Sequence, residues 1–162
     1  MPLSGRICSF LDSHHAPYSL TTHRSAFTAN EVASAEHLPV WEVAKSVVVV
    51  GDHKYYILVI PAHRHIDWRE ARTALGVRNL RLATEMELSD LFPDCEVGAN
   101  PPIGHPYGLP VYLDSELASE SRITFNAGTH RECLHMNTED YRKLVHPVVA
   151  SLVREEVSGL VW

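Results

Sequence analysis

The chain has 162 residues, 45% of them hydrophobic and 21% charged, and a net charge of −6 with histidine neutral. This length is typical of one domain with its own core, so we expect a single domain over residues 1–162. The acidic balance argues against a protein that grips DNA or long RNA, because such binding depends on neutralised phosphates. Contact with only one end of an RNA is compatible with this net charge.

Compartment and membrane association follow from what the sequence lacks. No apolar run approaches the roughly 20 residues that span a bilayer, and the N-terminus lacks the basic start and apolar block of a signal peptide. The three cysteines are an odd number without a CxxC pair, which argues against a disulfide framework. We therefore expect a cytoplasmic protein with no membrane partner.

Apolar periodicity and capping patterns predict the first elements in chain order. Thr28 with Glu31 three residues later is a capping box, and Asp67 and Thr84 are predicted N-caps of the next two helices. Four valines at 47–50 indicate a strand buried on both faces, joined to the next strand by three or four residues. The expected helices cover about residues 1–12, 28–38, 68–75 and 85–91, and the expected strands cover 18–23, 47–50, 55–60 and 78–83.

The last third predicts three short strands and a long helix. The strands are expected at 111–113, 123–126 and 134–136, with a polar connection over 115–122. Thr138 is the predicted N-cap of a final amphipathic helix whose apolar spacing runs to Val153 and which Pro147 kinks or divides. Strands and helices mix without strict alternation, which favours a mixed α/β (α+β) fold, a mixed sheet surrounded by helices.

The stretch from 92 to 114 is unusually rich in Pro and Gly. Each proline fixes φ and lacks an N–H, while each glycine allows close approach of another molecule. We interpret it as a stiff, thin loop that presents backbone groups to a small ligand. A surface crossover without a ligand is the alternative.

Two further positions in the sequence are candidates for binding or catalytic residues. Lys45 directly precedes the apolar strand, where a partly desolvated ammonium would attract an anion or an oxygen; a snorkelling lysine is the alternative. After the strand that ends at Asn126, small residues lead to Thr129 and His130, which could contact a ligand or could form an exposed turn.

Metal and phosphate sites have weaker support. His130, Cys133 and His135 are close in sequence but do not match the spacing of a zinc motif, so we expect no metal and no cofactor, and a metal-dependent hydrolase is kept as an alternative. Arginines at 64, 69, 72, 78 and 81 form either a solvated helix face or a small phosphate-binding patch.

Several segments together resemble the free-standing aminoacyl-tRNA editing domains, the YbaK/EbsC group related to the insertion domain of bacterial prolyl-tRNA synthetase. They are TANEVA (28–33), AKSVVV (44–49), LATEMEL (82–88), FPDCEVGANPPIG (92–104), VYLD (111–114) and FNAGTH (125–130). The resemblance implies a compact domain around a curved, barrel-like sheet. It also implies hydrolysis of the ester that joins a wrong amino acid to the end of a tRNA.

The resemblance also implies roles for single residues. Lys45 would polarise the ester or bind the terminal adenosine, the backbone at Gly98 would orient the carbonyl, and His130 would lie beside the aminoacyl group. With a histidine at this position, the chain resembles the branch of the family that removes small amino acids such as alanine, here from tRNA-Pro. It does not resemble the branch that removes cysteine. The substrate-binding residues implied are Thr22, His23, Thr28, Pro101, Pro102, Gly104, Asn126, Gly128 and Thr129.

The expected partner is the acceptor end of a mischarged tRNA, with a synthetase acting alongside in trans. A non-catalytic sensor of aminoacylated ends, with the same fold, is the alternative, because fold alone does not fix function.

Overall fold

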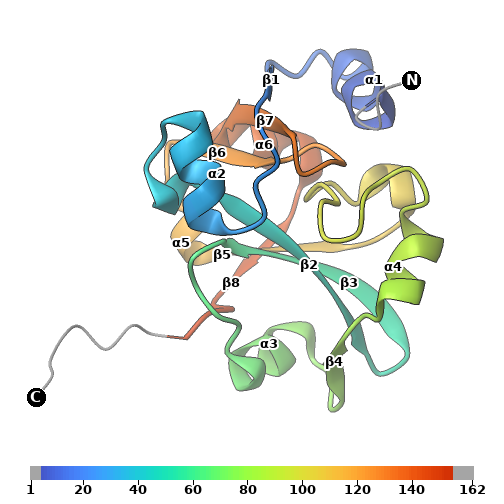
Figure 1. Ribbon diagram of the computed structural model, residues 1–162. Helices are drawn as coiled ribbons and strands as arrows, with labels where there is room; N and C mark the ends of the chain where they lie inside the picture. The colour runs from blue at the N-terminus through green and yellow to red at the C-terminus, as the bar shows by residue number, and fades with distance from the viewer. Residues whose placement is uncertain (1–4, 155–162) are drawn as a thin grey trace, which may run out of the picture.

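The computed structural model describes residues 5–154, which form two sheets with helices packed around them (Figure 1). The larger sheet has the strand order β4-β2-β3-β5-β8 and the smaller one the order β1-β7-β6. The strands are β1 Ser19–Thr22, β2 Ala44–Gly51, β3 Lys54–Pro61, β4 Leu80–Leu82, β5 Val111–Asp114, β6 Arg122–Asn126, β7 Glu132–Asn137 and β8 Val148–Ala150. The helices are α1 Gly5–Ser13, α2 Ala29–Glu36, α3 Trp68–Leu75, α4 Glu85–Leu91, α5 Ser115–Ala118 and α6 Thr138–Val145.

The mixed α/β class is confirmed. The larger sheet combines antiparallel pairs with the parallel pairs β3–β5 and β5–β8. A parallel bridge between Val43 and Thr124 joins the two sheets, and within residues 5–154 the strands do not close into a ring. Of the first predicted helix, Leu3 lies outside the described residues.

The β2–β3 hairpin is the centre of the molecule. Val47 and Val49 pack into one apolar cluster and Val48 into another, so the prediction of a strand buried on both faces is confirmed. The predicted connection of three or four residues is wrong, because Gly51 pairs with Lys54 and leaves a two-residue turn. Asp52 and His53 both have positive φ, as a tight type I′ hairpin turn requires.

The predicted helix caps hold in the first half of the chain. Thr28 and Thr84 each form a complete capping box, and Asp67 caps α3, which ends at the left-handed Gly76. Thr28 therefore fixes the start of α2, which lines one pocket together with the beginning of β2.

The C-terminal prediction is wrong in three respects. The final helix ends at Val145, and after Pro147 the chain becomes strand β8. Thr138 is the first helical residue and not the cap; Asn137 occupies the cap position without a side-chain hydrogen bond. The expected polar connection at 115–122 contains the short helix α5, capped by Asp114.

A physical reason accounts for the early end of α6. Proline cannot continue the backbone hydrogen bonds of a helix, and the β-branched valines that follow it suit a strand. Val148 and Val149 pair with Tyr112 and Leu113 of β5 and so complete the edge of the larger sheet. Their helical spacing matched the preceding helix by coincidence.

Candidate functional site

A pocket of about 300 Å³ lies where the start of β2 meets α2, the Gly–Pro loop and the end of β6. It is lined by four residues that the sequence singled out, Thr28, Lys45, Gly98 and Asn126. The other lining residues are Phe27, Ala29, Val32, Val43, Ala44, Ser46, Ala62, Asn100 and Phe125. Segments far apart in the sequence thus meet around one cavity lined by both apolar and polar residues.

Lys45 is the cationic side chain of this pocket. It is the second residue of β2 and lies exposed between the buried Ala44 and the half-buried Ser46. In residues 5–154 its ammonium forms no ion pair or hydrogen bond. Its charge is therefore available to a ligand. A lysine that only snorkels to solvent would need no ligand, and it stays the alternative.

The Gly–Pro loop, residues 92–110, is held against β2 by side-chain hydrogen bonds. Ser46 Oγ donates to the carbonyl of Pro101 at 3.3 Å and accepts from Asn100 Nδ2 at 3.0 Å. Asn100 is itself buried. Neither Ser46 nor Asn100 was predicted, although Ser46 follows Lys45 directly and Asn100 lies within the matching loop segment.

The turn after β6 holds the loop from its other side. Gly128 donates its N–H to the Ala99 carbonyl at 2.9 Å and accepts from Glu96 N at 2.7 Å. The Thr129 hydroxyl donates to Glu132 at 3.1 Å, within its own turn. Gly128 and Thr129 are buried and do not line the pocket.

His130 lies directly behind the pocket wall. Its Nε2 donates to the Val97 carbonyl at 2.9 Å, so that nitrogen carries the ring proton, and Nδ1 is buried without a hydrogen-bond partner. Its ring lies 4.5 Å from the ring of Phe27. A Cβ added at Gly98, where φ is +85°, would lie 3.7 Å from the imidazole. His130 therefore supports two lining residues and stiffens the loop.

Asn126 and Phe27 offer ligand-binding groups at opposite ends of the sequence. The Oδ1 of Asn126 is buried without a hydrogen-bond partner, which leaves an acceptor free for a bound molecule. Phe27 is 68% exposed at the pocket mouth, an unusual exposure for so large an apolar side chain. Phe27 was not predicted; its only signal is its place just before the capping box.

Pro101, Pro102 and Gly104 are buried within the loop and contribute its shape. A Cβ at Gly104 would lie 1.9 Å from the Leu109 carbonyl oxygen, so only glycine fits there. The buried Tyr141 donates its hydroxyl to the Pro102 carbonyl, and burial raises the pKa of Tyr141, which keeps the phenol protonated as a donor.

Cys95 is the one cysteine of this loop. Burial raises the pKa of its thiol to about 11, so the sulfur is protonated near neutral pH. A thiolate nucleophile at this position is therefore disfavoured.

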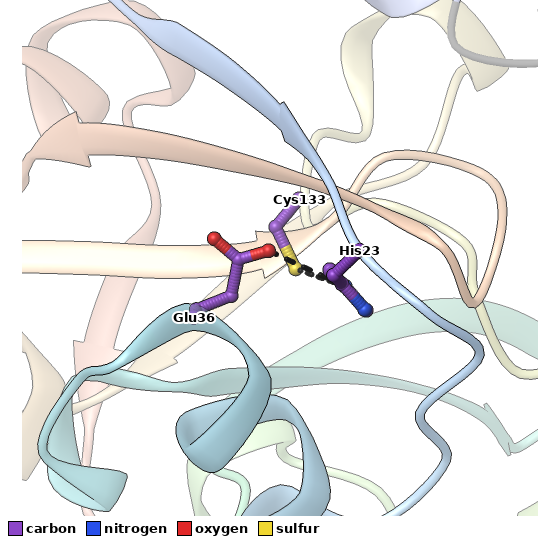
Figure 2. A group of neighbouring side chains, drawn as sticks. All are labelled: His23, Glu36 and Cys133. Carbon is purple, nitrogen blue, oxygen red and sulfur yellow. Dashed lines mark hydrogen bonds and ion pairs between the residues drawn. The ribbon is translucent and has the colours of Figure 1, made fainter.

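Thr22 and His23 lie away from the pocket. Thr22 pairs with Glu132 in the smaller sheet. The His23 side chain points into the protein and forms a buried polar cluster with Glu36 and Cys133 (Figure 2). The grouping of His130, Cys133 and His135 considered for a metal is not brought together, since His130 is held at Val97.

None of the five arginines lines the pocket of Lys45. Arg81 pairs opposite Val50, at the other end of β2, and donates to Glu87, while Arg64 donates to Glu116. These partners favour the solvated-face interpretation over a phosphate patch at the pocket.

A larger hollow, of about 680 Å³, follows α6 and the end of β7. It contains none of the predicted site residues, and its lysine, Lys143, is paired with Glu139 on the same helix. The smaller pocket is the better candidate site because its polar groups come from several elements, and the Lys45 ammonium and Asn126 Oδ1 among them have no partner in residues 5–154.

Comparison with known proteins identifies the family of the chain. Residues 23–144 match the family described as aminoacyl-tRNA editing domain. The chain belongs to this family. No curated protein matches the sequence. None of the helices in residues 5–154 has the length and apolarity needed to cross a bilayer.

Solved structures share the whole fold of this editing domain. A candidate trans-editing enzyme for prolyl-tRNA synthetase is 28% identical with a TM-score of 0.85, over 96% of this chain and 99% of that one. A scaffold protein with a computationally grafted epitope is 25% identical, also with a TM-score of 0.85, over 95% and 99% of the two chains. A hypothetical protein 20% identical, with a TM-score of 0.84 over 92% and 99%, shares the fold.

Proposed function

We propose that this editing domain is a trans-acting deacylase that hydrolyses the ester of a mischarged tRNA. The observation that carries the proposal is the pocket in which the unpaired Lys45 ammonium, the unpaired Asn126 oxygen and the Gly–Pro loop meet. The domain would act where tRNA is charged, in the cytoplasm, on the acceptor end presented by a synthetase.

The chemistry requires little beyond positioning and charge. A water molecule adds to the ester carbonyl, the bond to the ribose oxygen breaks, and the proton of the water passes to that oxygen, leaving a free amino acid and uncharged tRNA. An ammonium fixed near the carbonyl stabilises the oxyanion that develops, and a rigid wall holds the ester in place. Lys45 would supply the charge, and the backbone at Gly98 the wall.

The remaining groups would bind the two halves of the substrate. Asn126 Oδ1 can accept from the amino group of the aminoacyl moiety or from a ribose hydroxyl. Phe27, backed by His130, offers an exposed ring on which the terminal adenine can stack. His130 would then act by holding Phe27 and the loop, as a positioning residue.

The size and lining of the pocket support a small amino acid. Val32, Val43 and Phe125 form its apolar part, and a cavity of about 300 Å³ leaves little room once the ribose is bound. Alanine on tRNA-Pro is the substrate that we propose: the pocket supports the small amino acid, and the relative described as a trans-editing enzyme for prolyl-tRNA synthetase supports the choice of tRNA.

The test is a panel of mischarged tRNAs incubated with the full chain. We expect Ala-tRNA-Pro to lose its amino acid faster than the correctly charged Pro-tRNA-Pro, and also faster than the mischarged Cys-tRNA-Pro. Hydrolysis of none of them, with retained binding of aminoacylated RNA ends, would favour the sensor alternative instead.

The metal-dependent alternative is tested in the same assay after chelation, at a temperature where circular dichroism shows the chelated protein to be folded. We expect unchanged turnover, because no metal is needed for the proposed chemistry. Loss of turnover with the fold intact would contradict the metal-free mechanism.

A further inference from the structure

Three potential metal ligands converge at the end of α2 opposite to the pocket (Figure 2). His23 follows β1, Glu36 is the last residue of α2, and Cys133 lies in β7. One ligand atom from each lies within 4.8 Å of the others. The cluster is separate from the pocket, since none of the three residues lines it.

The cluster is enclosed by the protein. The side chains of His23 and Glu36 are 5% and 6% exposed, and Cys133 is 0% exposed. Surface groupings of this kind are common by chance, but buried polar groups are normally fully hydrogen-bonded. The Oε2 atom of Glu36 has no hydrogen-bond partner, although the Oε1 atom accepts from the Thr21 hydroxyl.

The tautomer of His23 directs a lone pair into the cluster. Its Nδ1 lies 2.5 Å from the Arg24 carbonyl oxygen, which can only accept, so Nδ1 carries the proton. Nε2 is then the unprotonated nitrogen, 3.3 Å from Cys133 Sγ and 3.5 Å from Glu36 Oε2. A ring N–H donating to a backbone carbonyl is the usual outer contact of a metal-binding histidine.

Two of the three separations, 3.3 Å and 3.5 Å from His23 Nε2, match a tetrahedral ion, and the third lies within 4.8 Å. Zinc bonds of about 2.0–2.1 Å to nitrogen or oxygen and about 2.3 Å to sulfur place neighbouring ligand atoms about 3.3–3.6 Å apart. Imidazole, thiolate and carboxylate are the three ligand types that zinc takes in proteins. A divalent cation would also balance the two negative charges of thiolate and carboxylate, giving a neutral buried site.

We propose that His23, Glu36 and Cys133 bind Zn²⁺. On binding, the ion displaces the thiol proton of Cys133, which leaves to solvent, and the sulfur bonds to the metal. The fourth position takes a water molecule or the imidazole of His135, whose Nε2 lies 3.2 Å from Glu36 Oε1.

The ion would join α2 to the smaller sheet and so stabilise one wall of the pocket. Cys133 packs in one apolar cluster with Val32 and Val43, and both valines line the pocket. The role is structural: the metal holds α2 in place and takes no part in the proposed ester hydrolysis.

The test measures metal binding by the full chain without a histidine tag. Expression in zinc-supplemented medium followed by atomic emission should give about one zinc per chain. Refolding with Co²⁺ should give the near-ultraviolet charge-transfer absorption of a cobalt–thiolate bond, and one equivalent of Zn²⁺ should remove it. Less than a tenth of an equivalent of zinc, with no thiolate band, would overturn the proposal.

Variants identify the ligands. Glu36→Gln keeps the side-chain shape, and Cys133→Ser removes the sulfur; each should lower zinc affinity at least tenfold, while the matched control Cys95→Ser should not change it. If Cys133→Ser fails to fold, Glu36→Gln and the cobalt spectrum of the unaltered chain still decide. Unchanged affinity in Glu36→Gln would show that zinc binds elsewhere and would reject the site.

The readouts separate this site from the deacylase proposal. Zinc should raise the melting temperature of the unaltered chain by several degrees and that of Glu36→Gln by less than one degree. This result does not depend on whether any aminoacyl-tRNA is hydrolysed.

Discussion

The Gly–Pro loop and the pocket that it borders differ in how their polar groups are hydrogen-bonded. Four carbonyls of the loop each accept a hydrogen bond from another part of the molecule: Val97 from His130, Ala99 from Gly128, Pro101 from Ser46 and Pro102 from Tyr141. In the pocket lining, the Lys45 ammonium and Asn126 Oδ1 have no partner in the described residues.

The difference separates shape from binding. The loop is fixed before a ligand arrives, so little ordering cost falls on binding. The unpaired groups opposite it gain their interactions only with a ligand present. Substitutions in the loop should therefore change stability, and substitutions across the pocket should change activity.

The largest effect is expected from Gly104→Ala. The added Cβ would meet the Leu109 carbonyl at 1.9 Å, and we expect a loss of about 3 kcal/mol in the free energy of unfolding. Urea unfolding measures it. The control Gly108→Ala meets no atom within 4 Å and adds only left-handed strain, about 1 kcal/mol. Equal losses would contradict the close approach as the cause.

Lys45→Ala should lower kcat/KM for deacylation at least about tenfold, a loss of roughly 1.4 kcal/mol in transition-state stabilisation. The melting temperature should stay unchanged, because the side chain is exposed and unpaired. Lys143→Ala, which removes another exposed lysine, is the matched control and should keep full activity. Unchanged turnover in Lys45→Ala would remove this lysine from the mechanism.

Phe27→Ala should raise KM about fivefold with kcat nearly unchanged, corresponding to about 1 kcal/mol of lost stacking on the terminal base. Steady-state kinetics on the mischarged tRNA measures it. Phe27→Tyr keeps the ring and should behave like the unaltered chain. A fall in kcat without a change in KM would instead place Phe27 in the geometry of the reaction.

Asn126→Ala is expected to have the smallest effect, about threefold in kcat/KM, as one neutral hydrogen bond contributes about 0.5–1.5 kcal/mol. Stability should not fall, because the Oδ1 atom has no partner to lose. Thermal melting beside the kinetic assay checks both. A clear loss of stability with unchanged kinetics would assign Asn126 to the fold and not to the ligand.

Local sequence signals predicted most of the elements. Thr28, Asp67 and Thr84 cap their helices as expected, because capping depends on residues within one turn. The valines of β2 are buried on both faces as their pattern indicated. The prediction failed where a distant partner decided the outcome: the valines after Pro147 become β8 because β5 offers an edge to pair with.

For the site, the sequence by itself determined the types of group and which segments carry them: Lys45 before an apolar strand, and a stiff loop around Gly98. Only the tertiary structure decided which side chains share a cavity. It directed the ring of His130 to the loop carbonyl of Val97 and turned His23 toward Cys133, 110 residues away in sequence. The reason is that side-chain direction and burial depend on contacts between segments distant in the chain, which no local pattern records.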